Sequence, residues 1–318
     1  MSPVTEESYP VELDAPDISP WRDGNTGIPY FTTLDSGRPG PHALVLALTH
    51  GNEICGAIAV KHLFDIGFHP AAGRVTLGFA NIAAYAQFDP REPNNSRYVD
   101  EDLNRVWDFA TLHGPRHSVE LDRAREIRPL IDTVDYLLDI HSMQHRTEPL
   151  MLAGPLDKGT VLARRVGLPR TIVRDGGHAA GKRLRDYGSF GEPGAAAAAL
   201  LVECGQHWES AAANVAVATA LRFLDCLGLL DTGDRERVPA AAGAQRVIEV
   251  TEAVTIMTDQ FQFVQDFWGE EIIPDAGTLL GTDGGREIRT PYPNCVLIMP
   301  SRRLVRGQTA VRLGRVVD

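Results

Sequence analysis

The sequence predicts an α/β fold in which helices flank a mostly parallel, mixed sheet, followed by a smaller C-terminal all-β domain. Short apolar runs of strand length alternate with helical stretches over most of the chain, a pattern typical of parallel sheets. A segment that contains Pro, Gly and small residues (233–245) then precedes β-rich sequence with turn signals. We therefore expect two domains, residues 1–235 and residues 245–318.

The expected elements of the first domain follow in order. Residues 1–25 are acidic and contain several prolines, which indicates an irregular segment. The apolar run HALVLALTH (42–50) predicts a strand buried on both faces, and apolar spacing predicts a helix over 53–67 that ends at a glycine. Three further apolar runs predict strands at 74–81, 135–142 and 198–205. Helical stretches are expected at 118–133 and 208–228.

The C-terminal segment has a different pattern. Three stretches are rich in β-forming residues: RVIEVTEAVTIMT, NCVLIMP and QTAVRLGRVV. The short sequences PDAG, TDGG and PYPN mark turns between them. These features predict a small domain built of strands alone.

Composition and charge exclude several classes of protein. The 318 residues carry a net charge of −11 without a long run of one sign, which argues against a general nucleic-acid-binding protein. No apolar stretch reaches the roughly 18 residues of a membrane span, and the acidic N-terminus lacks the features of a targeting peptide. Four cysteines without a CxxC pair indicate reduced thiols. We therefore expect a cytoplasmic protein that binds neither nucleic acid nor membrane and that could form a homo-oligomer.

Three of the predicted strands end in residues that can bind a metal or transfer a proton, namely His50, His141 and Glu203. Ligands of open α/β sheets bind at the carboxyl ends of the strands, so these side chains are expected to meet. Glu53 follows His50 by three residues, where strand changes to helix, so the two side chains can converge. Two imidazoles and one carboxylate are the ligands of many catalytic zinc sites. The sequence therefore predicts one Zn²⁺ per subunit, held by His50, Glu53 and His141, although other divalent metals suit the same ligands.

Glu203 remains as a free carboxylate in the apolar strand ALLVECG, where a buried charge needs a partner. Beside a metal, it could take a proton from water and return it to a leaving amine. Each of these residues taken alone is more often structural, and only their combination favours a catalytic site. The sequence contains no GxSxG nucleophile motif and no Walker or GxGxxG nucleotide motif.

A second polar stretch, NNSRYVDEDLNRVW (94–107), contains Arg97, Asn104 and Arg105. Guanidinium groups bind carboxylates through paired hydrogen bonds, and an asparagine amide can support them. The stretch could be an ordinary surface loop whose arginines pair with its own acidic residues. Near a metal site a different interpretation is favoured, in which Arg97 lies beside the scissile carbonyl and the other two residues bind a substrate carboxylate.

The motifs THGNE, DLNR, DIHS and VECG, in this order between residues 42 and 208, resemble the succinylglutamate desuccinylase/aspartoacylase family, which belongs to the zinc carboxypeptidase-like group. The resemblance implies hydrolysis of the amide bond of an N-acyl amino acid. It also implies an α/β domain followed by a smaller β domain that narrows the entrance to the site. We therefore expect a zinc-dependent deacylase with a small-molecule substrate.

The same resemblance implies a role for each site residue. The zinc ligands would be His50, Glu53 and His141. Glu203 would be the general base that activates water, and Arg97 would stabilise the oxyanion. A substrate carboxylate would be bound by Asn104 and Arg105.

The sequence departs from better-known members of the family near the predicted base. In the stretch DYGSFGEPGAAAAALL before Glu203, no residues match in place the further arginine and tyrosine with which aspartoacylases hold their substrate. Tyr187 or Tyr292 could replace them. In the Gly-rich basic stretch that precedes it, Arg174 or Arg185 could meet an anionic group.

Two alternatives to a deacylase remain open. A metallocarboxypeptidase would use the same metal site on short peptides. A non-catalytic protein could bind a metal or another ligand on the same scaffold, but binding alone requires neither Glu203 nor Arg97.

Overall fold

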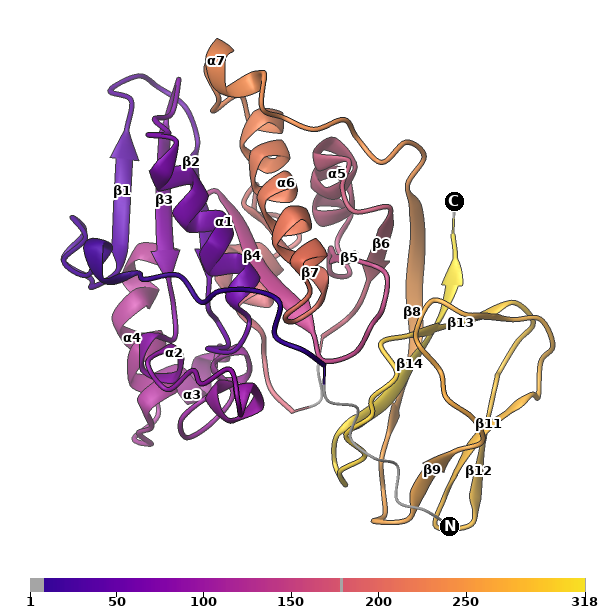
Figure 1. Cartoon of the computed structure of the whole chain (residues 1–318). Helices are drawn as coiled ribbons and strands as arrows, with labels where there is room; N and C mark the ends of the chain where they lie inside the picture. The colour runs from indigo at the N-terminus through magenta and orange to yellow at the C-terminus, as the bar shows by residue number, and fades with distance from the viewer. Residues whose placement is uncertain (1–8, 178–179, 318) are drawn as a thin grey trace.

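The computed structural model describes residues 9–177 and 180–317 of the chain. Within these residues, most strands form one large sheet and three strands form a small second sheet (Figure 1). From edge to edge, the large sheet consists of β1 (Phe31–Asp35), β3 (Arg74–Phe79), β2 (His42–Ala47), β4 (Tyr136–Met143), β7 (Ala198–Gln206), β5 (Leu150–Leu152), β6 (Thr171–Arg174), β8 (Arg246–Thr255), β14 (Thr309–Val316), β13 (Cys295–Ile298) and β10 (Ile272–Ile273). The small sheet consists of β12 (Arg286–Arg289), β11 (Leu279–Asp283) and β9 (Phe261–Phe263).

The strands at the centre of the large sheet run parallel. Neighbours are parallel from β3 through β2 and β4 to β7, and again from β5 through β6 to β8. Antiparallel pairs join β1 to β3, β5 to β7, and the C-terminal strands β8, β14, β13 and β10 to one another. The predicted class, a mostly parallel mixed sheet followed by a C-terminal β region, is confirmed.

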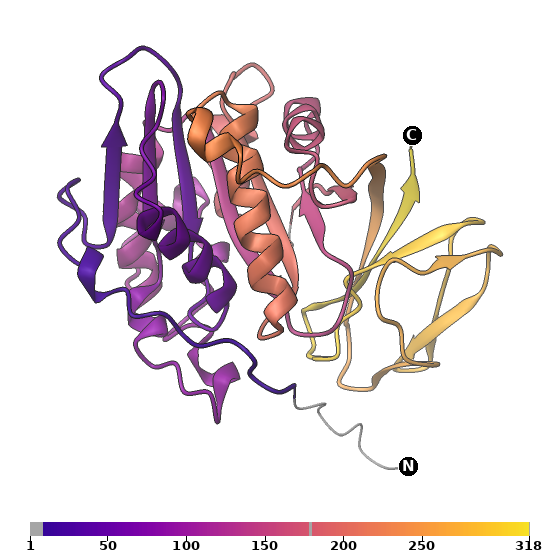
Figure 2. The same cartoon turned by 45° about the horizontal axis from the view of Figure 1, so that its top comes forward.

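Helices cover both faces of the parallel strands. One face carries α1 (Ile54–Asp65), α5 (Asp157–Val166) and α6 (Ser210–Cys226), and the other carries α4 (Val119–Ile131) (Figure 2). Alternate residues of β2 enter the two cores, because Val45 packs on the α1 side and Leu44 on the α4 side. This explains why the strand is apolar throughout. The short helices are α2 (Ile82–Tyr85), α3 (Phe109–His113) and α7 (Thr232–Arg235).

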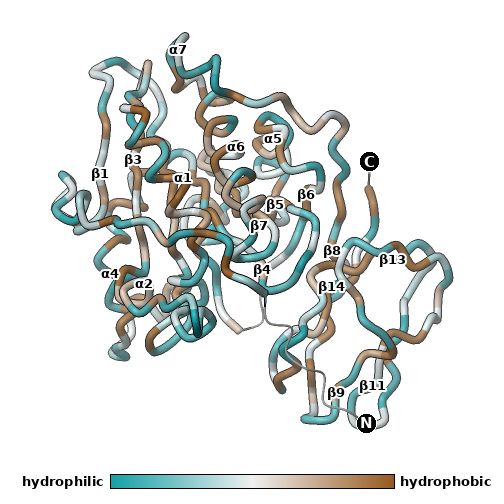
Figure 3. The backbone as a smooth tube through the Cα atoms, viewed as in Figure 1, coloured by the Kyte–Doolittle hydropathy of each residue, from teal (hydrophilic) through white to brown (hydrophobic). Residues whose placement is uncertain are grey.

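The hydropathy of the helices agrees with their positions relative to the sheet. In Figure 3, α1 is largely hydrophobic where it lies against the sheet, whereas α7 is hydrophilic. Among the residues that the structure describes, no helix combines the length and apolar character needed to cross a membrane.

The C-terminal strands extend the large sheet. β8 pairs in parallel with β6, and β14 pairs with β8 along most of its length. The small sheet packs with these strands around a core that includes Ile256, Phe261, Leu280 and Leu297. The division into residues 1–235 and 245–318 runs through the large sheet and through a hydrophobic core in which Leu150 and Leu201 pack with Ile248 and Val296, and it stays a prediction.

The structure differs from the expected elements mainly in its short strands. β1, β5 and β6 were not expected, because strands of three to five residues are too short for a clear periodic pattern. Helix α5 was not expected either. The strand expected over 42–50 ends at Ala47, because Leu48 has a φ of 60° and leaves the strand conformation.

Candidate active site

His50 and Glu53 lie in the turn between β2 and α1. Glu53 precedes the first turn of α1, and its backbone N–H donates to the His50 carbonyl at 3.2 Å. Gly51, between them, donates its N–H to the Arg97 carbonyl at 3.1 Å. A Cβ atom on Gly51 would lie 2.4 Å from the carbonyl oxygen of Ser96, so only glycine permits this close approach. The turn thereby brings Arg97 next to the two side chains.

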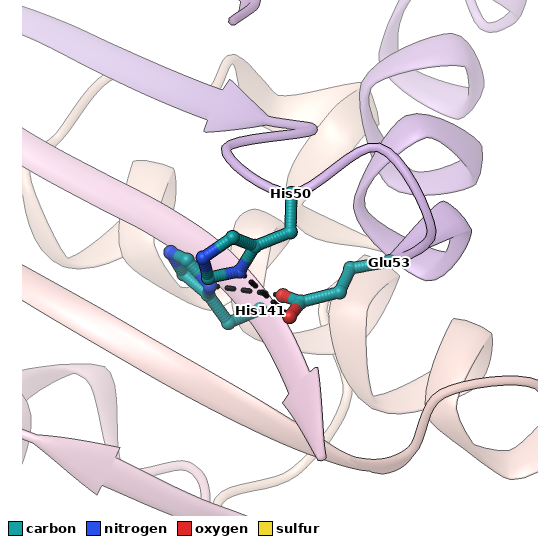
Figure 4. A group of neighbouring side chains, drawn as sticks. All are labelled: His50, Glu53 and His141. Carbon is teal, nitrogen blue, oxygen red and sulfur yellow. Dashed lines mark hydrogen bonds and ion pairs between the residues drawn. The ribbon is translucent and has the colours of Figure 1, made fainter. Parts of the chain in front are cut away.

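His141 lies near the carboxyl end of β4, which is paired with β2. Both imidazoles point at the Glu53 carboxylate (Figure 4), with Nδ1 of His50 2.7 Å from Oε1 and Nδ1 of His141 2.9 Å from Oε2. One ligand atom from each residue lies within 4.8 Å of the other two, and all three side chains are buried. The fold therefore brings the three predicted ligands together, and this donor set fits a zinc ion.

The electrostatics of the three residues favour an ionised carboxylate. Burial raises the pKa of Glu53, but His50 and His141 outweigh this effect and hold the pKa well below its usual range. A deprotonated carboxylate is the form that binds a metal.

Each histidine also contacts a carboxylate through its other ring nitrogen. Nε2 of His50 lies 2.8 Å from Asp102, and Nε2 of His141 lies 2.9 Å from Asp139. The hydroxyl of Thr49 donates to the second oxygen of Asp139 at 2.8 Å. These contacts leave both Nδ1 atoms for a metal, as in many carboxylate–histidine–zinc arrangements.

Neither Asp102 nor Asp139 was identified from the sequence. The signal was present for Asp139, because residues two apart on a strand lie on the same face, as Asp139 and His141 do. Asp102 is the first residue of the DLNR motif. It is 52 residues from His50 along the sequence, so no local spacing indicates that the two side chains are in contact.

Glu203 lies on β7 directly beside His141. The two residues are partners in the parallel β4–β7 register, so their side chains lie on the same face of the sheet. Burial, together with the nearby Glu53, raises the pKa of Glu203 to about 8. Within the described residues, the Oε2 atom of Glu203 is buried without a hydrogen-bond partner. The carboxyl group thus lies next to the candidate metal centre, and its Oε2 atom is available for a hydrogen bond to a ligand or water.

The loop that contains Arg97, Asn104 and Arg105 forms another side of the site. The Arg97 guanidinium lies 3.1 Å from Glu53 and 3.3 Å from Asp102. Burial lowers the pKa of Arg97, but these two carboxylates outweigh it and hold the pKa above its ordinary value. The side-chain oxygen of Asn104 accepts a hydrogen bond from the backbone N–H of Leu184 at 2.9 Å.

All seven predicted site residues line one pocket of about 340 Å³. Its lining comes from the loops at the carboxyl ends of β2, β4 and β7 and also from the C-terminal β region, through Met299, Thr309 and Arg312. The C-terminal strands therefore contribute one wall of the pocket.

The four residues that the sequence suggested for substrate selection do not line the pocket. Tyr187 donates its hydroxyl to Asp132, Arg174 is 3.1 Å from Asp157, and neither they nor Tyr292 and Arg185 are among the residues that line the pocket. Arg183 and Arg312 line it instead. No pattern in the sequence distinguishes Arg183 from its neighbours, because the direction of each side chain in an irregular segment has no periodic signal.

His207 also lines the pocket. Its Nδ1 atom is 2.8 Å from the hydroxyl of Ser142, whose backbone N–H donates to Glu53 at 3.1 Å. Burial lowers the pKa of His207 to about 3, so the imidazole is neutral near pH 7. This residue supports the site from the turn after β7.

Comparison with known proteins identifies relatives of this arrangement. Residues 39–226 match the family model described as the succinylglutamate desuccinylase/aspartoacylase catalytic domain. An aspartoacylase from Xenopus tropicalis is 28% identical over 133 residues, which are 39% of this chain and 41% of the frog protein. The match with that curated relative thus spans less than half of its length.

Solved structures extend the likeness to most of the chain. A succinylglutamate desuccinylase from Vibrio cholerae has a TM-score of 0.68 at 16% identity, covering 91% of this chain and 86% of that chain. Murine aminoacylase 3 has a TM-score of 0.63 at 17% identity, covering 88% of this chain and 96% of that chain. At these identities the likeness shows a shared fold.

Proposed function

The chain belongs to the succinylglutamate desuccinylase/aspartoacylase family, and from this premise we propose that it is a zinc-dependent hydrolase that cleaves the amide bond of an N-acyl amino acid. The observation that carries the proposal is the convergence of His50, Glu53 and His141 on one point, with Glu203 beside them on the next strand. The volume of about 340 Å³ suits a small molecule better than a peptide chain.

A zinc ion held by His50, Glu53 and His141 would polarise the acyl carbonyl and lower the pKa of a water molecule. Glu203 takes the proton from the attacking water and delivers it to the leaving nitrogen, so that a carboxylic acid and a free amino acid are released. Its Oε2 atom has no hydrogen-bond partner among the described residues and is therefore available to the water.

Arg97 and the DLNR residues act on the substrate in this proposal. Arg97 lines the pocket next to Glu53 and donates to the oxygen on which negative charge develops. Asn104 and Arg105 bind the α-carboxylate of the amino acid and place its acyl group towards Glu203.

The test is a hydrolysis screen of the purified protein, with and without a chelator, alongside metal analysis. N-acetyl and N-succinyl amino acids are compared with dipeptides that have free amino termini. We expect about one zinc per subunit, chelator-sensitive release of free amino acids from N-acyl substrates, and little cleavage of dipeptides. Preferential cleavage of dipeptides would indicate a carboxypeptidase, and stoichiometric zinc without any hydrolysis would indicate a binding protein.

A further inference from the structure

A second pocket lies beside helix α6, and its lining shares no residue with that of the candidate active site. Its volume is about 650 Å³. One side of it is mainly apolar and comes from the segment between α5 and β6, from α6 and from the connection after α7, with Leu168, Pro169, Val215, Ala218 and Pro239. A largely apolar pocket of this size with a few polar groups is typical of a site for a small organic molecule.

Glu270 contributes a carboxylate to this pocket from the C-terminal β region. The side chain is 9% exposed, and its Oε2 atom accepts a hydrogen bond from Nη2 of Arg246 on β8. Its Oε1 atom is buried without a hydrogen-bond partner among the residues that the structure describes. A buried carboxylate oxygen without a donor is unfavourable, and a ligand that donates a hydrogen bond removes that cost.

The backbone at Glu270 is strained. Its φ is 67°, in the left-handed region that is unfavourable for a residue with a side chain. The backbone N–H of Glu270 donates to the Leu297 carbonyl at 2.6 Å, and this contact with β13 holds the residue in place. The fold therefore places the carboxylate at the pocket at a cost in free energy.

The charges around Glu270 favour a cationic ligand. Burial raises the pKa of Glu270, and the Thr171 hydroxyl and Arg246 oppose this effect. Glu148, which also lines the pocket, raises the pKa further. Two carboxylates thus lie near each other, and a cation between them relieves their repulsion. Arg170 lines the pocket as well, but it is exposed, so solvent weakens any contact that it makes to an anionic ligand.

We propose that this second pocket binds an aliphatic ammonium ion, whose N–H groups donate to Glu270 and Glu148 while its carbon chain packs against α6 and residues 168–169. The ammonium group belongs either to a simple amine or to a free amino acid, whose carboxylate then lies towards Arg170. The ligand contacts residues from both sides of the connecting segment 233–245. Binding requires neither the metal centre nor hydrolysis, so the inference is independent of the proposed function.

Calorimetry on the full-length protein compares three ligands with one carbon skeleton. Isoamylamine carries the ammonium group, isoamyl alcohol has a hydroxyl group in its place, and L-leucine adds a carboxylate to the amine. We expect the amine to bind roughly tenfold or more tightly than the alcohol, because a hydrogen bond between charged groups is stronger than one to a neutral donor. Tighter binding of leucine than of the amine identifies an amino acid as the ligand, and the reverse order identifies a simple amine.

Variants on two sides of the pocket test its contacts. Glu270→Gln keeps the size of the side chain but removes its charge, so it should remove most of the preference for the amine over the alcohol. Glu249→Gln, at an exposed position of β8 outside the pocket, is the matched control and should keep that preference. Equal binding of amine and alcohol to the unmodified protein, or an unchanged preference in Glu270→Gln, would overturn the site.

A variant of α6 tests the pocket without altering Glu270. Ala218→Phe fills part of the pocket, so it should weaken the binding of all three ligands, and it replaces Glu270→Gln should that variant fail to fold. Ala211→Phe introduces the same side chain at an exposed position of the same helix and should bind them normally. Unchanged binding in Ala218→Phe would place the ligands elsewhere and refute the proposal.

Two further titrations separate this pocket from the candidate active site. The amine is titrated into protein treated with a chelator and into Glu203→Gln. Unchanged binding in both samples supports a second site, even if the hydrolysis screen finds no substrate. Binding that is lost in either sample places the amine in the active-site pocket and counts against the proposal.

Discussion

At the scale of single residues, each histidine of the candidate metal centre has its own carboxylate partner. Asp102 lies 2.8 Å from Nε2 of His50, and Asp139 lies 2.9 Å from Nε2 of His141 and accepts a hydrogen bond from a threonine hydroxyl. Such partners fix which ring nitrogen faces the metal and make the imidazole a better ligand. The affinity for zinc should therefore depend on residues that would not contact the ion.

Replacing Asp139 with asparagine tests this dependence. Asp139→Asn keeps the shape of the side chain but removes the charge next to His141, so zinc affinity should fall by roughly 10- to 100-fold. Competition with a chromophoric chelator measures the dissociation constant. Asp65→Asn, at an exposed carboxylate paired with Lys61 on α1, is the control and should bind zinc normally. Unchanged affinity in Asp139→Asn would show that the contact does not support the ligand.

Glu203 should be needed for turnover and dispensable for metal binding. Glu203→Gln retains the size of the side chain but cannot accept the proton of water, so kcat should fall by about 10²- to 10⁴-fold. Steady-state rates on the substrate found in the screen and zinc analysis of the same sample measure both properties. Glu252→Gln, on the exposed face of β8, should behave as the unmodified protein. Near-normal rates in Glu203→Gln would remove Glu203 from the mechanism.

His42 should make stability depend on pH. Its imidazole is buried at the start of β2, with Nδ1 3.1 Å from the Thr133 carbonyl and Nε2 2.8 Å from the Thr76 hydroxyl. Burial and the nearby Arg74 lower its pKa from the ordinary 6.5. Below pH 6.5 the unfolded chain therefore binds a proton that folded His42 does not, and stability falls as the pH falls.

Urea unfolding at pH 7.5 and pH 5.5 measures this dependence. The unmodified protein should lose stability between the two values, and His42→Gln should lose less. At pH 7.5 the variant itself should be less stable by about 1 kcal/mol, because two buried hydrogen bonds are altered. An equal loss in both proteins would assign the pH dependence to other groups.

The residues that the sequence could identify are those inside compact motifs. His50 and Glu53 are three residues apart, so their spacing indicates a shared site. His141 and Glu203 come at the ends of predicted strands, where ligands of α/β sheets bind. Arg312 could not be found in this way. It reaches the pocket from the last strand, and only the folding of β14 against β8 places it there.

At the scale of elements, the loop that contains Arg97, Asp102 and Arg105 is held by one buried acid on α4. The carboxylate of Glu120 accepts hydrogen bonds from the backbone N–H groups of residues 99, 100 and 101 and from the side chain of Asn81, at 2.7–3.2 Å. The charged acceptor thus organises the segment between the predicted oxyanion and carboxylate-binding residues.

Glu120→Gln should weaken both the fold and the site. One acceptor oxygen becomes an NH₂ group that faces backbone donors, so the free energy of unfolding should fall by about 2–3 kcal/mol. Because the loop contains Arg97 and Arg105, kcat/KM should fall in the same variant. Denaturant unfolding and steady-state kinetics measure the two effects. Asp122→Asn, on the exposed side of the same helix, should change neither by much; a wild-type profile for Glu120→Gln would contradict this role.

Elements were predictable in proportion to their length. The runs that became β2, β4 and β7 are six or more residues long and mostly apolar, because both faces of each strand are buried, and they stand out in the sequence. β5 has only three residues, and it is set as a strand by pairing with β6 and β7 rather than by its own pattern. The periodicity of a sequence does not indicate which strands pair with one another.

At the scale of the whole molecule, the C-terminal β region is attached to the rest by more than the connecting segment. β8 continues the sheet beside β6, and Arg312 of β14 forms an ion pair with Asp175, which follows β6. We retain residues 1–235 and 245–318 as a proposed division of the chain, and one hydrophobic core contains residues of both parts, such as Leu150 and Ile248. The sheet and the shared pocket nevertheless predict that neither part works alone.

Cleavage of the connection tests this prediction without removing any part of the chain. Residues 241–244 are exposed, so a protease site inserted after Gly243 should be cut in the folded protein. The two fragments should still elute together in gel filtration and keep most of the activity found in the hydrolysis screen, because the backbone hydrogen bonds between β6 and β8 and the ion pair between Asp175 and Arg312 remain. Arg312→Gln in the cut protein should loosen the association, since it removes one of these links. Fragments that separate on cutting would show instead that the covalent connection, and not the continuous sheet, holds the pocket together.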